Sequence, residues 1–174
     1  MFIASQVMGL FSLIIYIISF QIDNRNKLLN LQIFANIFAV FQYLLLQAYS
    51  GMSMFIIAIL GNYLFKKSKS IYSLILVLIL IFISAIFTNN NLINLLPIIA
   101  YTVYCIALWQ LKLKLLRIAE IIACILYIIY DLYVLAFVGV ISSLIELIFG
   151  LIAIYRFDIR KDVKNESTFK ISNY

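Results

Sequence analysis

The chain has 174 residues, of which 66% are hydrophobic and 11% charged, and its mean hydropathy is +1.13. A chain this short and this apolar could not cover its core with polar surface, which excludes a soluble globular domain. The formal net charge of +6 would suit nucleic acid, but the basic residues flank apolar segments. We therefore expect the lipid bilayer and anionic headgroups on its cytoplasmic side as partners, and no nucleic acid.

The spacing of the basic residues predicts the topology. All thirteen lysines and arginines fall at residues 25–27, 66–69, 112–117 and from 156 onward. About 40 apolar residues separate consecutive clusters, twice the roughly 20 residues that cross a bilayer once, so each interval must cross and return. The positive-inside rule places all four clusters in the cytoplasm. The N-terminus is then outside and the C-terminus cytoplasmic.

Seven transmembrane helices follow from this pattern. The first five spans are predicted at residues 3–20, 28–47, 51–65, 71–87 and 92–110, followed by two spans within residues 115–155. Residues 115–155 as one helix would be about 60 Å long, twice the hydrocarbon thickness, so we predict a break near residues 136–139. Uncharged outer turns are predicted at residues 48–51 and 88–91.

An internal repeat is predicted from an offset of 88 residues, which aligns the first three spans with the last three. The predicted turn at residues 48–51 then falls on residues 136–139. The offset also pairs the following residues: Gly9 with Pro97, Tyr16 with Tyr104, and Gln32 with Glu120. Each copy has three spans, so the chain ends a copy on the opposite side of the bilayer from where it began. The two copies can share an orientation only if one extra helix returns the chain across the bilayer.

The fold class is therefore an all-α membrane bundle with a 3+1+3 arrangement of parallel repeats, as in SWEET proteins. Its predicted parts are a first three-helix repeat at residues 1–70, a linker helix at 71–91, a second repeat at 92–157 and a polar cytoplasmic tail at 158–174.

Three short segments carry a resemblance to a known family. The segments are Gln6-Val7-Met8-Gly9, Gln47-Ala48-Tyr49-Ser50-Gly51 and Leu95-Leu96-Pro97-Ile98-Ile99. They resemble the YgjV-type bacterial inner-membrane proteins, which are distantly similar to SWEET, PQ-loop and PnuC-type carriers. The resemblance implies a multi-pass protein of the bacterial inner membrane but no particular activity. Those carriers often have a Pro-Gln dipeptide in the first helix of each repeat. Here the first repeat has Gly9 at that position, and in the second repeat Pro97 is followed by Ile98 instead of glutamine.

Polar residues within the apolar spans are the candidate substrate-binding residues, because polar groups at membrane depth are costly and face the bundle interior. Glu146 lies in the middle of the last span and would be neutral, carry a proton or pair with a cationic substrate. Gln32 and Asn36 share a helix face with Tyr43, and Asn62 lies at a similar depth. Carboxamides suit a solute with hydroxyl or amide groups, since they both donate and accept hydrogen bonds. The alternative is that these residues only join helices.

Other residues receive simpler interpretations. Pro97 and Gly9 are candidate hinge residues, because proline can bend a helix. Glu120 is expected to pair with Arg117 at the cytoplasmic edge, and Asp131 to be solvated at the outer mouth. Cys105 and Cys124 are expected to be structural thiols.

The leading functional hypothesis is a small-solute facilitator or ion-coupled carrier with a midplane site between the repeats. The alternative is a non-transporting membrane scaffold or subunit. The chain has no histidine and no nucleotide or zinc motif, so we expect neither an enzyme, nor a cofactor, nor a metal site. The sequence does not identify the solute, and it leaves open whether the chain forms a homo-oligomer.

Overall fold

The computed structural model describes residues 1–20, 25–67, 70–88, 91–110 and 113–155. These residues form seven α-helices and one short 3-10 helix, which confirms the predicted helix count over the described ranges. In chain order they are α1 (Phe2–Phe20), α2 (Arg25–Leu45), α3 (Tyr49–Lys67), α4 (Ile71–Thr88), η1 (Leu92–Asn94), α5 (Leu95–Gln110), α6 (Leu113–Tyr133) and α7 (Phe137–Ile154). The tail predicted at residues 158–174 lies outside the described residues.

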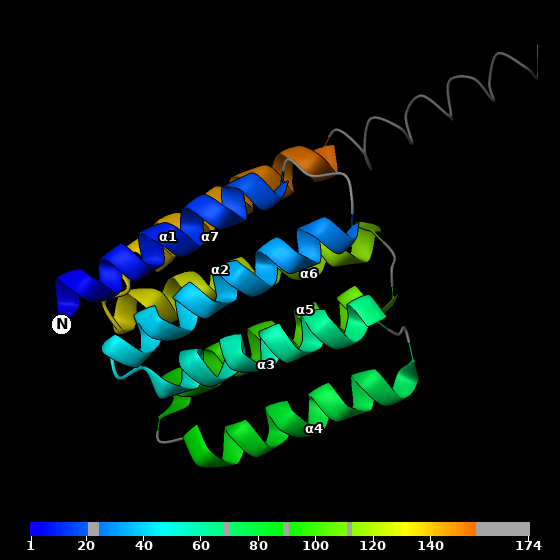
Figure 1. The fold of residues 1–174 in the computed structure, drawn as a ribbon, viewed down its shortest axis with the longest axis horizontal. Coiled ribbons are helices and arrows are strands. Elements are labelled where there is room, and N and C mark those ends of the chain that lie inside the picture. The colour runs from blue at the N-terminus through cyan, green and yellow to red at the C-terminus, as the bar shows by residue number, and fades with distance from the viewer. Residues whose placement is uncertain (21–24, 68–69, 89–90, 111–112, 156–174) are drawn as a thin grey trace, which may run out of the picture.

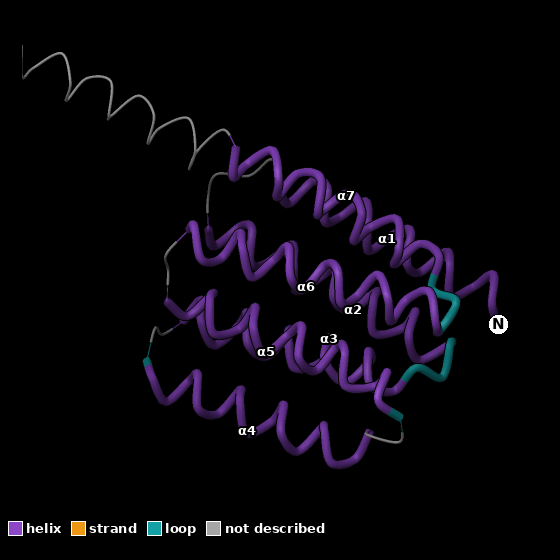
Figure 2. The backbone as a smooth tube through the Cα atoms, turned by 180° about the vertical axis from the view of Figure 1, so that it is seen from behind, coloured by secondary structure: helices purple, strands orange, loops and turns teal. Residues whose placement is uncertain are grey.

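Six of the helices form a ring, and α4 packs outside it. Helix α1 contacts α2 and α7, helix α3 contacts α2 and α5, and helix α6 contacts α5 and α7. Helix α4 packs against α3 and α5. Seen from the side, α1, α2 and α3 form one layer, while α7, α6 and α5 form a second layer behind it (Figures 1 and 2). The space between these two layers holds the candidate site described below.

The outer surface of the bundle is apolar. Within the described residues, three segments are long and apolar enough to cross a membrane, namely Phe2–Ser19, Ile71–Thr88 and Leu92–Gln110, and two shorter apolar segments occupy Leu29–Leu45 and Phe137–Ile152. Large side chains such as Phe82 and Ile86 on α4 are mostly exposed. Exposed apolar area on this scale is unfavourable in water but suits contact with lipid tails.

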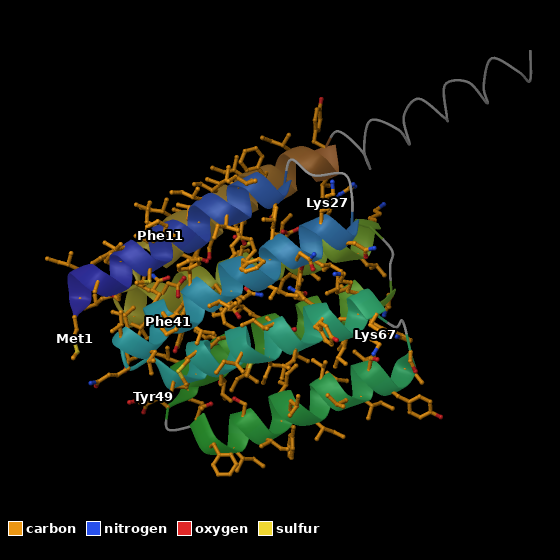
Figure 3. All side chains as sticks on the ribbon, viewed as in Figure 1. Met1, Phe11, Lys27, Phe41, Tyr49 and Lys67 are labelled. Carbon is orange, nitrogen blue, oxygen red and sulfur yellow. The ribbon has the colours of Figure 1, made fainter. Side chains whose placement is uncertain are left out.

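The two ends of the bundle differ in charge. Figure 3 shows Lys27 and Lys67 at one end of the helices and Met1 and Tyr49 at the other. We call these the lysine end and the turn end. Lys66, at the lysine end, donates a 2.8 Å hydrogen bond from its Nζ to the side-chain oxygen of Asn30.

The turns predicted at residues 48–51 and 136–139 come about two residues early, whereas α4 ends at Thr88 and η1 begins at Leu92, in agreement with the turn predicted at 88–91. Helix α2 ends at Leu45 and α3 begins at Tyr49, so the predicted turn at residues 48–51 is wrong in register. The reversal is made by Gln47, with φ 57°, and by Leu135, with φ 58°, in the loop between α6 and α7. Non-glycine residues seldom adopt positive φ, so residue type does not indicate these turns. Gly51 lies inside the first turn of α3, where its lack of a side chain serves packing.

Candidate functional site

A cavity of about 120 Å³ lies between the two layers and is lined by all six helices of the ring. The four predicted substrate-binding residues, which come from α2, α3 and α7, all line it. They are Gln32, Asn36, Asn62 and Glu146. The structure thus brings together residues that lie up to 114 positions apart in the sequence (32 to 146). Their role in binding stays a prediction, but their convergence on one space is a feature of the fold.

The two asparagines are buried. Asn36 is 1% exposed and accepts a 2.5 Å hydrogen bond from the Tyr16 hydroxyl on α1. Asn62 on α3 is 5% exposed. One amide is therefore already oriented by a neighbouring helix, while its nitrogen remains a donor toward the cavity side of the bundle.

Glu146 enters the cavity from the middle of α7. It is half-buried, and its Oε2 lies 3.9 Å from the Cys124 sulfur on α6. Lysine and arginine are absent from the cavity lining of the described chain, whereas Glu120, Asp131 and Glu146 all contribute carboxyl groups. The titratable groups of the site are therefore acidic or phenolic, apart from one thiol. Both Cys105 and Cys124 are free and buried.

Asp131 is buried, which corrects the expectation that it is solvated at the outer mouth. It is 1% exposed and accepts a hydrogen bond from the hydroxyl of Tyr43, itself 2% exposed. Asp131 lies within the last turn of α6, a position normally near water, but α2 and the first turn of α7 cover it. A Cβ on Gly139 would lie 2.6 Å from Asp131 Oδ2, so α7 approaches this closely only because residue 139 is glycine.

The two hinge candidates occupy different settings. A Cβ on Gly9 would lie 2.6 Å from the side-chain amide of Gln42, so this glycine makes room for a cavity-lining residue. Pro97 is buried in the first turn of α5, directly after η1. Backbone N–H groups there lack partners within the helix, so Pro97 breaks no bond of the helix interior. A hinge role for either residue stays a prediction.

A family model for bacterial inner membrane proteins, Imp-YgjV, matches residues 3–161. The match covers most of the chain. The protein belongs to the Imp-YgjV family. No curated protein and no solved structure matches the chain. Membership of Imp-YgjV places it in the bacterial inner membrane, in agreement with the apolar helices and with the predicted localisation.

Several residues that line the cavity of this Imp-YgjV protein were not among the predicted site residues. The largest group comprises tyrosines: Tyr16, Tyr101, Tyr104 and Tyr127. The 88-residue offset pairs Tyr16 with Tyr104 and Gln32 with Glu120, and all four line the cavity. The 88-residue offset is therefore the signal in the sequence that could have identified Tyr16, Tyr104 and Glu120 as cavity residues. The expected pairing of Glu120 with Arg117 stays a prediction.

Two polar atoms around the cavity lack a hydrogen-bond partner among the described residues. They are the amide nitrogen of Gln42 and the hydroxyl of Tyr101, whose side chains are 3% and 6% exposed. Buried polar groups are normally satisfied, and each unsatisfied one costs about 1–3 kcal/mol. In the described ranges no three His, Cys, Asp or Glu side chains are grouped as metal ligands. The Gln42 amide lies against Gly9 and the Tyr101 hydroxyl against Gly61, so both atoms are covered by neighbouring helices.

Proposed function

We propose that this Imp-YgjV protein is a small-solute facilitator or ion-coupled carrier. The observation that supports this most strongly is the convergence of Gln32, Asn36, Asn62 and Glu146 on one cavity between two helical layers. If these residues served only to join helices, they would be distributed over separate packed interfaces. A shared cavity lined by polar side chains is what a binding site within a membrane bundle needs.

We further propose that the two layers are parallel repeats, α1–α3 and α5–α7, joined by the linker helix α4. Helices α2 and α6 each contain 21 residues and begin 88 residues apart. The two positive-φ residues, Gln47 and Leu135, differ by the same 88 positions. Cavity-lining positions also recur at this offset: Tyr16/Tyr104, Gln32/Glu120, Asn36/Cys124, Ala39/Tyr127, Tyr43/Asp131, Phe55/Ser143 and Ala58/Glu146. These coincidences support the proposed kinship with SWEET-like carriers, in which the site lies at the repeat interface.

The turn end carries cross-links between the layers that could act as a gate. Tyr43 on α2 donates a hydrogen bond to Asp131 on α6. The backbone N–H of Gly51 on α3 donates a 3.0 Å bond to the hydroxyl of Tyr130 on α6. Gln6 on α1 donates a 3.1 Å bond to the backbone oxygen of Leu135. Rocking of one layer against the other would break this set of bonds and open the cavity toward the turn end.

The proposed orientation places the lysine end in the cytoplasm and the turn end outside. We expect a membrane-impermeant thiol reagent added to intact cells or spheroplasts to label Tyr49→Cys but not Lys67→Cys. Lys27→Cys is the matched second cytoplasmic position. Labelling of the wild-type protein, which contains Cys105 and Cys124, gives the background that is subtracted. Equal labelling of positions 49 and 67 from one side would refute the proposed topology.

The transport proposal is tested with protein purified and reconstituted into liposomes. We expect at least one solute among sugars, nucleosides, amino acids and amines to raise the thermal unfolding midpoint and to enter the vesicles. Asn36→Ala and Glu146→Gln should each reduce uptake by about tenfold or more, the effect of losing one buried polar contact. Asn30→Ala is the matched control, because Asn30 is exposed on the same helix and does not line the cavity.

The scaffold alternative makes the opposite prediction for the same variants. If no solute shifts the unfolding midpoint or enters the vesicles, and Asn36→Ala behaves like Asn30→Ala in uptake, the carrier proposal is wrong. The polar residues would then serve helix packing alone, with a contribution of about 0.6–2 kcal/mol per bond.

A further inference from the structure

We infer that the cavity binds a small organic cation, an ammonium compound that also carries a hydrogen-bond acceptor. This inference names the solute class for the site of the proposed function and rests on that proposal for its transport consequence. Binding itself can be measured without transport. The inference comes from three properties of the cavity, which are its charge, its aromatic lining and its carboxamide groups.

The charge of the lining is one-sided. Three carboxyl groups face the cavity, from Glu120, Asp131 and Glu146, and the described lining contains no lysine or arginine. Asp131 already accepts a hydrogen bond from Tyr43. Glu146 lies in the middle of its helix, where its carboxyl group contacts the thiol of Cys124. A carboxylate in this position is most stable with a cation beside it, and the described cavity wall does not provide one.

The rest of the wall is aromatic. Six rings line the cavity: Tyr16, Tyr43, Phe55, Tyr101, Tyr104 and Tyr127. Phe55 connects two of them, with its ring centroid 5.2 Å from Tyr43 and 5.8 Å from Tyr127. Aromatic walls combined with a carboxylate are the usual means of binding ammonium groups, because the ring faces attract cations. An anion would be repelled by the acidic groups, and a sugar could use them only as hydrogen-bond acceptors, without the attraction of opposite charges.

The carboxamides of the lining indicate a second feature of the ligand. Asn36 and Asn62 line the cavity, and an amide both donates and accepts hydrogen bonds. An ammonium compound with a hydroxyl or carbonyl oxygen would offer them an acceptor. Size sets a limit as well. Since a cavity of about 150 Å³ accommodates benzene, about 120 Å³ suits a ligand of roughly five to seven non-hydrogen atoms.

Choline and 3,3-dimethylbutan-1-ol form the decisive ligand pair. They have the same shape and hydroxyl group, but only choline is charged. We expect choline to bind the purified protein at least about tenfold more tightly than the neutral analogue, by thermal shift and calorimetry. Glu146→Gln should remove most of this difference while the neutral analogue binds as before. Equal affinity for the two compounds, or binding of neither, would overturn the inference.

A second measurement uses the wild-type protein and needs no variant to fold. Cys124 lines the cavity beside Glu146, whereas Cys105 is fully buried in the core between α3, α4 and α5. We expect a trimethylammonium methanethiosulfonate to modify Cys124 at least about tenfold faster than the sulfonate analogue, each rate divided by its rate with a free thiol. Choline should protect Cys124, and peptide mapping should show Cys105 unmodified. A preference for the anionic reagent, or no preference, would contradict the inference.

The two proposals fail in different ways. Charge-selective binding of choline without any uptake would leave the organic-cation site in place and end the carrier proposal. Uptake of a neutral solute with no preference for choline would preserve the carrier and end the organic-cation site.

Discussion

Replacing Tyr43 with phenylalanine is expected to lower the free energy of unfolding by about 1–2 kcal/mol. The substitution removes the hydroxyl that donates to Asp131 and keeps the ring, whose centroid lies 5.2 Å from that of Phe55. A carboxyl group that is 1% exposed then loses a donor in a place that water reaches poorly. The expected value is at the upper end for membrane helix contacts because the acceptor can be charged. Unfolding in mixed SDS micelles would measure it.

The control for this prediction is Tyr133→Phe. Tyr133 lies on the same end of α6 as Asp131, but it is 55% exposed, so loss of its hydroxyl should change stability by only a few tenths of a kcal/mol. The Tyr43→Phe, Asp131→Asn cycle should also show a coupling energy between the two positions. Additive effects, or equal effects of Tyr43→Phe and Tyr133→Phe, would show that the bond contributes little.

The same bond matters for function under the proposed gate. Breaking the Tyr43–Asp131 contact removes one of the links that hold the two layers together at the turn end. We therefore expect Tyr43→Phe to increase labelling of Cys124 by an impermeant reagent added on the side that carries Tyr49. This readout separates a gate from a purely structural contact, since a structural contact would affect stability and leave one-sided access unchanged.

The helix count and membrane class could be predicted because they depend on strong and simple terms. Cationic side chains do not enter hydrocarbon readily, so the four basic clusters limit where helices can begin and end. Helix α1 spans Phe2–Phe20 against the predicted residues 3–20, and α4 spans Ile71–Thr88 against 71–87. A break within residues 115–155 is confirmed by the gap between Tyr133 and Phe137, about two residues before the predicted position at 136–139.

The exact positions of the turns could not be predicted because they depend on backbone dihedral angles that the residue types do not indicate. Gln47 and Leu135 adopt positive φ although neither is glycine. The predicted turns include Gly51 and Gly139 because glycine is common in turns, but both glycines lie inside helices. Their small size accommodates side chains of neighbouring helices from both layers, which is a tertiary requirement and has no local signature.

The candidate site was partly predictable. Polar residues in the middle of apolar spans must face inward, so Asn36, Asn62 and Glu146 could be chosen from their positions in the sequence. Asp131 could not, because a charged residue within the last turn of a span is normally solvated. The proposed repeat offers the missing rule. Residues near a twofold axis meet their own equivalents, and Tyr43 and Asp131 are 88 positions apart and bonded to each other.

The acidic and aromatic lining also explains why resemblance alone could not identify the solute. The proposed likeness to larger groups of carriers concerns only the number and order of the helices, whereas the groups that face the cavity differ even between the two proposed repeats. Asn36 corresponds to Cys124 and Ala58 to Glu146 at the 88-residue offset. A site between such copies is chemically asymmetric, so its ligand must be inferred from the side chains present and not from the fold.

Gly51→Ala is expected to be the other strongly destabilising substitution, with a loss of about 1–3 kcal/mol. A Cβ at this position would lie 2.8 Å from Cδ1 of Tyr43 and 2.9 Å from Cε1 of Tyr130. Both rings are almost fully buried, and the Tyr130 hydroxyl is fixed by the N–H of Gly51 itself. The rings can therefore yield only by moving α2 and α6 away from α3, which would also strain the Tyr43–Asp131 bond.

Gly150→Ala provides the matched control for this last prediction. Its Cβ would meet only Ile121 Cγ1 at 3.5 Å, an ordinary contact, so the better helix propensity of alanine should stabilise α7 by up to about 1 kcal/mol. The two variants add the same methyl group to the same kind of helix, and they differ in what the methyl group meets. The measurement is the mole fraction of SDS at which half of the protein is unfolded. If this value is the same for both variants and the wild type, α2, α3 and α6 are not tightly packed at the turn end. The proposed gate would then have no rigid frame on which to close.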